Sequence, residues 1–348
     1  MNQLTSPVQE QPQLPRFGRE PASHFEDTQK LESFLRPLIK SFVKDLGYEK
    51  PTRIDKEVYW SKLHERAAET GIPHAKGTHS HSCLEVGGLY AIACLPNHPL
   101  DVQIYVGIYT WVAIVIDDTA SHQLADYERF HERFAAGEHQ PTCVLENWAE
   151  LLRSTFKYWE PIIANFIIAS SLDFLNACIL ESRSEFLSLI PTKGSRNFPW
   201  YIRSKTGVGD AYAYFTFPKG LFPDFSSYVE VVPDLSKFFC LANDILSFYK
   251  EEVAGEDANY IHRAAQQEGK NVREFLKDVI TETLSAFHRI CVVFEDRELE
   301  RQVLNDYILG YVTEGITHDE PRPEGIRPPS RALDAFVESI ASEMGLNP

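Results

Sequence analysis

Residues 102–118 read VQIYVGIYTWVAIVIDD, so about twelve apolar residues precede two aspartates. Residues 237–252 read KFFCLANDILSFYKEE, in which an apolar half turns into a polar, acidic half. A helix that is apolar on nearly every side is buried at the centre of a helical protein. The two segments therefore predict two central helices, and the charged end of each must reach either solvent or a cavity.

Apolar stripes with helical spacing run through most of the remaining chain. In the first, Leu31, Phe34, Leu38 and Phe42 recur at steps of three and four residues. Further stripes cover residues 56–70, 82–95, 124–136, 144–158, 160–184, 224–252, 270–294 and 297–313. Prolines fall between the stripes, and alternating strand-like runs are nearly absent. We therefore predict one all-α domain over residues 26–348, after a flexible, proline- and glutamine-rich arm at residues 1–25.

The composition narrows the class of protein. Hydrophobic residues make up 43% of the 348, which is enough for a large core and excludes a disordered chain. The net charge of −16 argues against nucleic acid and anionic membranes as partners. The sequence shows no apolar signal segment and no run of about 18 uncharged apolar residues, so we expect a cytoplasmic protein without membrane insertion. Six cysteines without a CxxC pair are expected to be buried thiols.

The central segment 237–252 carries a row of oxygen-bearing side chains. Asn243, Ser247 and Glu251 are spaced by four residues, which places them on one helical face. An amide carbonyl, a hydroxyl and a carboxylate suit Mg²⁺, which often joins a protein to a phosphate. Lys250 could contact that phosphate as a point charge. The alternative is the polar face of an ordinary surface helix.

The other central segment ends in Asp117 and Asp118. Adjacent carboxylates are unfavourable at the C-terminal end of a helix, where the helix dipole is already negative. A divalent cation would remove that penalty, whereas a solvated helix end would need no ligand. Neither acidic motif decides the function alone.

Together, the Asp pair and the later NDILSFYKE resemble the class I terpene cyclases, most closely the trichodiene synthase-type fungal sesquiterpene cyclases. The resemblance covers residues 80–325 in motif order and spacing. It implies an α-helical bundle with a central active-site cavity, in which the two motifs hold three Mg²⁺ ions, with Mn²⁺ as a substitute. It also implies a sesquiterpene cyclase that ionises farnesyl diphosphate, cyclises the carbocation and releases diphosphate.

The resemblance also assigns roles to the metal-site residues. Asp117 would bind two of the ions, with Asp118 as a supporting carboxylate. Asn243, Ser247 and Glu251 would hold the third ion, and Lys250 would contact the diphosphate. The Asp motif reads DDTAS, so Ser121 stands where many relatives have a third acidic residue.

Further roles fall on residues outside the two motifs. Arg203 in WYIRSKTGVG aligns with an arginine that senses diphosphate in this family, although a surface ion pair is the alternative. Gly207 falls where relatives have a helix break whose carbonyl assists ionisation. Arg322 would contact diphosphate from the C-terminal segment, but Pro323 replaces the usual tyrosine and Arg327 is a competing candidate.

Several apolar and aromatic side chains are candidates for the cavity wall. Aromatic faces stabilise carbocations, although for any one ring plain core packing is the favoured interpretation. The candidates are Tyr109, Ala113, Ile114, Tyr212, Phe215 and Phe239. His79 and His81 resemble a zinc pair, but no third or fourth ligand follows at zinc-site spacing.

Two alternative functions remain open from the sequence. One is a prenyl diphosphate chain-elongating synthase, which normally needs a second Asp-rich motif where this chain has NDILSFYKE. The other is a catalytically weak or inactive isoprenoid-binding helical protein. The sequence also leaves a homodimer open.

Overall fold

The computed structural model describes residues 24–47, 57–189, 191–192 and 194–317. Every regular element in these ranges is helical, which confirms the predicted all-α class. The α-helices are α1 (His24–Asp45), α2 (Glu57–Glu69), α3 (His79–Cys94), α4 (Leu100–Thr119), α5 (Leu124–Glu128), α6 (Phe130–Ala136), α7 (Cys143–Ser154), α8 (Pro161–Glu181), α9 (Ser184–Leu187), α10 (Phe198–Thr206), α11 (Gly209–Phe215), α12 (Val232–Ala254), α13 (Tyr260–Glu268), α14 (Val272–Val293) and α15 (Glu298–Thr317). The predicted arm at residues 1–25 lies almost entirely outside the described residues.

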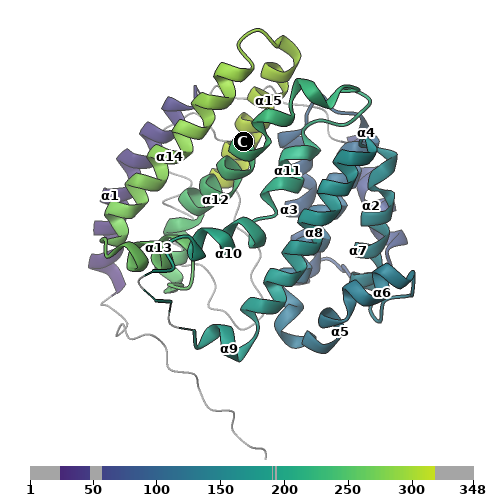
Figure 1. Cartoon of the computed structure of the whole chain (residues 1–348), viewed down its shortest axis with the longest axis horizontal. Coiled ribbons are helices and arrows are strands. Elements are labelled where there is room, and N and C mark those ends of the chain that lie inside the picture. Colours follow the sequence, from purple (N-terminus) through teal and green to yellow (C-terminus); the bar gives the residue numbers. More distant parts are fainter. Residues whose placement is uncertain (1–23, 48–56, 190, 193, 318–348) are drawn as a thin grey trace, which may run out of the picture.

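The two apolar segments form α4 and α12, as predicted. Figure 1 shows α12 in the middle of the molecule, with α14 and α1 on one side and α11 on the other. Helix α4 packs along α3 so closely that a Cβ at Gly87 would lie 2.6 Å from the carbonyl oxygen of Gly107. Only glycine fits such an approach of two backbones. Most residues of both helices are buried, which confirms the prediction.

Side-chain caps determine where helices α3 and α13 begin. The hydroxyl of Thr78 accepts a hydrogen bond from the backbone N–H of His81 and starts α3. The amide oxygen of Asn259 accepts one from the backbone N–H of His262 and starts α13. Such caps satisfy backbone groups that the helix itself leaves unpaired. They place His79 and Asn259 at defined positions beside the ends of α4 and α12.

Two helical segments are long and apolar enough to cross a membrane by length and composition, Leu100–His122 and Pro161–Glu181. In the first, 72% of the apolar window is buried inside the protein, as in the core helix of a bundle. In the second, 44% is buried. The first segment is explained by the packing of α4 in the core.

Candidate active site

The polar face of α12 carries the predicted Asn-Ser-Glu row. Asn243, Ser247 and Glu251 are partly exposed, while Asp244 and Phe248 between them are buried. The Ser247 hydroxyl donates to Glu251 Oε1 at 2.6 Å, and Asn259 Nδ2 donates to Glu251 Oε2 at 2.6 Å. Both carboxylate oxygens of Glu251 are therefore already oriented by hydrogen bonds.

The carboxyl group of Glu251 also has an unusual acidity. Burial raises its pKa to about 7, the Ser247 hydrogen bond opposes the rise, and the charge of Asp244 adds to it. A carboxyl group with a raised pKa is one whose charged form lacks compensation. A bound cation would supply that compensation, so the electrostatics of Glu251 fit a metal ligand.

Arg203 reaches α12 from α10 and lies beside the same row. Its Nε donates to both carboxylate oxygens of Asp244, at 2.9 and 3.0 Å, and its Nη2 donates to Asn243 Oδ1 at 3.0 Å and to the Cys240 carbonyl at 2.8 Å. The Arg203 and Asp244 side chains are only 12% and 8% exposed. Burial lowers the pKa of Arg203, but the charge of Asp244, the Cys240 thiol and the hydrogen bonds to Asp244 together hold the pKa above its ordinary value.

Arg203 does form an ion pair, but the pair is buried, so the alternative of a surface ion pair is wrong. Sequence reasoning missed Asp244, whose only signal was its place beside Asn243. It also missed Asn259, which reaches Glu251 from the start of α13. The guanidinium thus links the helix break region of α10 directly to a predicted metal ligand.

The helical structure is interrupted between α10 and α11, at the position predicted from the sequence. Helix α10 ends at Thr206 and α11 begins at Gly209, with Val208 at φ 49°. A β-branched residue at positive φ is a strained backbone conformation. A Cβ at Gly207 would lie 2.5 Å from Cys240 Sγ and 2.6 Å from Arg203 Nη1. The break therefore packs directly on the guanidinium, and Gly207 leaves room for it.

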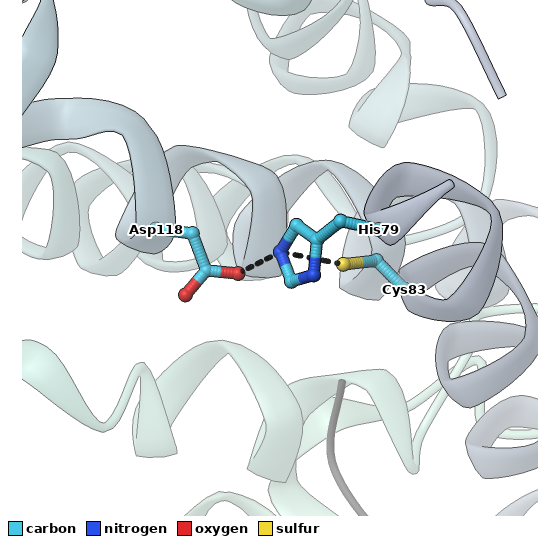
Figure 2. Close-up of side chains that lie close together, drawn as sticks. All are labelled: His79, Cys83 and Asp118. Atoms are coloured by element: carbon cyan, nitrogen blue, oxygen red, sulfur yellow. Dashed lines mark hydrogen bonds and ion pairs between the residues drawn. The ribbon is translucent and has the colours of Figure 1, made fainter. Parts of the chain in front are cut away.

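The aspartates at the end of α4 are held by two different helices. Asp117 is exposed, and its Oδ1 accepts a hydrogen bond from Cys178 Sγ of α8 at 3.4 Å. Asp118 turns toward α3, where its Oδ2 lies 2.6 Å from His79 Nε2 (Figure 2). Ser121, in the altered Asp motif, is exposed.

The ends of α4 and α12 lie at the same end of the bundle. In Figure 1, the helices that follow them, α5 and α13, lie in the lower part of the molecule, as does α9 after α8. Helix α8 joins the two regions: its Cys178 contacts Asp117, and its Glu181 pairs with Arg263 of α13 at 2.8 Å. The two predicted motifs therefore share one end of the fold.

The predicted wall residues divide by burial. Tyr109 and Phe215 have no exposed surface, and their rings pack against each other at 4.8 Å. Tyr109 also donates or accepts a hydrogen bond with Ser171 Oγ at 2.6 Å. In this structure both rings belong to the packed core, and their contact with a substrate stays a prediction. Ala113 is nearly buried, and Ile114 is partly exposed.

Tyr212 and Phe239 belong to an aromatic group that the sequence did not reveal. Tyr90 of α3 packs edge-on against Tyr212 at 5.1 Å and near Tyr311 of α15 at 6.1 Å. Phe239 of α12 stacks on Tyr307 at 4.5 Å. Four helices thus present aromatic rings to one another, which sequence spacing within single helices could not show.

Three further residues were predicted to contact diphosphate: Lys250, Arg322 and Arg327. Lys250 is 8% exposed on α12, so its side chain is largely within the protein. Arg322 and Arg327 lie outside the described residues, and their contact with diphosphate stays untested.

The sequence model of the trichodiene synthase (TRI5) family matches residues 42–323, most of the chain. The chain belongs to this family. It is 39% identical to the longiborneol synthase of Gibberella zeae over 264 residues, which cover 75% of this chain and 78% of that protein. It is 36% identical to terpene synthase BipA of Cochliobolus sativus, over 81% of this chain and 87% of the relative.

Solved structures share the fold of this trichodiene synthase family member. The linalool/nerolidol synthase of Streptomyces clavuligerus superposes with a TM-score of 0.61 at 10% identity, over 76% of this chain and 98% of that chain. The isoprene synthase of grey poplar, in complex with three Mg²⁺ ions and dimethylallyl-S-thiolodiphosphate, gives 0.52 at 15% identity, over 90% of this chain and 59% of that chain. At such identities the likeness concerns the fold alone.

Family membership confirms the predicted resemblance and the predicted enzyme class. The protein is a terpene synthase, a carbon–oxygen lyase that acts on phosphates, in a class I all-α fold.

Proposed function

We propose that the protein is a Mg²⁺-dependent sesquiterpene cyclase that ionises farnesyl diphosphate, cyclises the resulting carbocation and releases diphosphate. The observation that carries the proposal is the polar face of α12. There, Glu251 has a pKa raised to about 7 and lies on the same face as Asn243, which is hydrogen-bonded to a buried arginine. A site that pairs an under-compensated carboxylate with a guanidinium suits a divalent cation and a phosphate together.

The donor set fits the metal. Asn243, Ser247 and Glu251 offer only oxygen atoms, which hard Mg²⁺ prefers, and Asp117 adds an exposed carboxylate at the same end of the bundle. When bound, Mg²⁺ would neutralise the charge that develops on the leaving diphosphate. We propose these four residues as its ligands, with Mn²⁺ as a substitute.

The chain's own residues would do the rest. Arg203 would bind the diphosphate through its guanidinium, assisted by Lys250, and Asp244 would keep the guanidinium charged and oriented. The allylic C–O bond breaks with its electron pair leaving on diphosphate. The aromatic rings of Tyr212 and Phe239 would then exclude water and stabilise the cation through their faces.

The family resemblance supports farnesyl diphosphate as the substrate. The composition supports a cytoplasmic location without membrane insertion. The longiborneol synthase and BipA names support terpene chemistry, and the TRI5 match supports a fungal sesquiterpene cyclase. Against chain elongation, NDILSFYKE occupies the place of the second Asp-rich motif.

The test is incubation of the full-length protein with geranyl, farnesyl or geranylgeranyl diphosphate, with and without Mg²⁺. Volatile products are identified by mass spectrometry and released diphosphate is measured. We expect Mg²⁺-dependent cyclic products from farnesyl diphosphate. Asp117→Ala and Asn243→Ala should nearly abolish turnover while Asp101→Ala, at the other end of α4, retains it. If the products are prenyl diphosphates longer than the substrate, the protein is a chain-elongating synthase. If the protein binds the substrate but releases no diphosphate, it is an inactive isoprenoid-binding protein.

A further inference from the structure

A second group of metal-ligating side chains lies at the start of α3. His79, Cys83 and Asp118 each offer one ligand atom, and these atoms lie within 4.8 Å of one another. His79 Nε2 is 2.6 Å from Asp118 Oδ2 and 3.4 Å from Cys83 Sγ, and the imidazole ring lies between these two side chains in Figure 2. None of the three is a proposed Mg²⁺ ligand.

The backbone positions the three side chains for a shared ion. His79 and Cys83 are four residues apart on α3, the spacing that puts two ligands on one helical face in zinc enzymes. Asp118 reaches them from the last turn of α4, which packs along α3. The other ring nitrogen, Nδ1 of His79, is buried and has no hydrogen-bond partner within the described part of the chain. Among the described residues, the hydrogen bonds of the His79 ring are therefore those with Cys83 and Asp118.

The ligand chemistry separates this group from the Mg²⁺ site. A thiolate, an imidazole and a carboxylate suit Zn²⁺ and similar transition metals, whereas Mg²⁺ selects oxygen ligands. Zinc bonds of about 2.0–2.3 Å put neighbouring ligand atoms about 3.3–3.7 Å apart in a tetrahedron. The observed 2.6 and 3.4 Å distances differ from that by less than about 1 Å. The Cys83 sulfur and the Asp118 carboxylate lie within 4.8 Å of each other, so side-chain rotation would have to bring these two groups closer around a shared ion.

We propose that His79, Cys83 and Asp118 form a three-ligand site for a zinc-class divalent metal, with the fourth position open to water. Binding converts the Cys83 thiol to a thiolate and releases its proton to solvent, with no change of oxidation state. His79 and Asp118 are each 21% exposed, which leaves a route for the ion, while Cys83 is buried. The proposal does not depend on the Mg²⁺ site or on the terpene substrate.

His81, the other histidine of GTHSHSC, does not join this group. The sequence offered no third or fourth zinc ligand for His79 and His81, and in the structure His81 lies toward Glu85, at 3.4 Å. The missing ligands come instead from Cys83, one turn further along, and from a helix end 39 residues away. Sequence spacing alone could therefore not bring Cys83 and Asp118 together with His79.

The test is a Co²⁺ titration of the chelator-treated, full-length protein, followed by absorption. We expect a thiolate-to-Co²⁺ charge-transfer band that saturates at one ion per chain, survives excess Mg²⁺ and disappears when Zn²⁺ is added. Cys83→Ser should abolish the band. Cys178→Ser is the matched control, because its sulfur also contacts a carboxylate, and it should retain the band.

A second variant guards against misfolding of Cys83→Ser, since Cys83 is buried. His79→Gln, at a partly exposed position, should weaken Co²⁺ binding at least about tenfold while circular dichroism shows unchanged helix content. A band that is absent in the wild type, unchanged in Cys83→Ser or His79→Gln, or lost in Cys178→Ser would overturn the proposal.

Discussion

Removing one partner of the buried pair Arg203 and Asp244 should destabilise the protein far more than removing one partner of a similar pair on the surface. Asp244→Asn removes the charge that faces a guanidinium only 12% exposed, while keeping one oxygen that can accept from Nε. Hydrogen bonds to charged groups contribute about 1.5–3 kcal/mol, so we expect the free energy of unfolding to fall by that amount. Asp244→Ala, which leaves the charge without any partner, should cost about 3–5 kcal/mol.

The same helix supplies a matched control. Asp234 of α12 accepts two bonds from Arg289 Nε, at 3.0 and 3.1 Å, and one from Nη2 at 2.7 Å, but the two side chains are 28% and 47% exposed. Exposed ion pairs contribute about 0.2–1 kcal/mol. We therefore expect Asp234→Asn to destabilise the protein by no more than that.

The measurement is urea unfolding followed by circular dichroism, with the slope against urea compared among the variants. Equal slopes allow the shifts of the midpoints to be read as changes in stability. If Asp234→Asn and Asp244→Asn lower the midpoint equally, burial does not control the strength of these pairs and the reasoning fails.

Three further results are expected. Because the pKa of Glu251 is raised from 4.5 to about 7, the metal-free protein should lose stability as the pH rises from about 4.5 to about 7 and change little above that range. Mg²⁺ should raise the melting temperature more above pH 7 than below it, and Glu251→Gln should remove both effects. Gly207→Ala places a Cβ 2.5 Å from its nearest neighbour and should cost about 1–3 kcal/mol in urea unfolding. Gly220→Ala, with nothing within 4 Å, should change it by less than about 0.5 kcal/mol, and equal effects would contradict the packing argument. Tyr109→Phe should cost about 0.5–1.5 kcal/mol through its lost bond to Ser171, and an unchanged midpoint would refute it.

The long helices were predictable because their apolar stripes are long. The stripes at residues 56–70, 82–95 and 270–294 correspond to α2, α3 and α14 within three residues at either end. The stripe at 124–136 proved to be two helices, α5 and α6, and the stripe at 224–252 begins with 3-10 turns before α12 starts at Val232. Helices α10, α11 and α13 have only seven to nine residues, too few turns for a stripe to stand out.

The site was predictable only as far as one helix reaches. Spacing alone places Asn243, Ser247 and Glu251 on one face, because helical geometry is local. Their partners come from other helices: Asp244 binds an arginine 41 residues earlier, and Asp118 binds a histidine 39 residues earlier. Such pairs depend on how helices pack, and a single sequence carries no signal for that.

The hydrogen bonds around α12 change how a cation would bind there. Asn243 Oδ1 is held by Arg203, and the two oxygens of Glu251 are held by Ser247 and Asn259. The hydrogen bonds therefore already restrict the rotamers of these side chains. Cation binding would then lose less side-chain entropy. Each of these oxygens keeps a further lone pair that could bind a cation while the hydrogen bond remains. Because Arg203 donates to Asn243 and is the proposed contact of diphosphate, its guanidinium connects a proposed metal ligand to the proposed phosphate site. Substrate and cation should then bind more tightly together than apart.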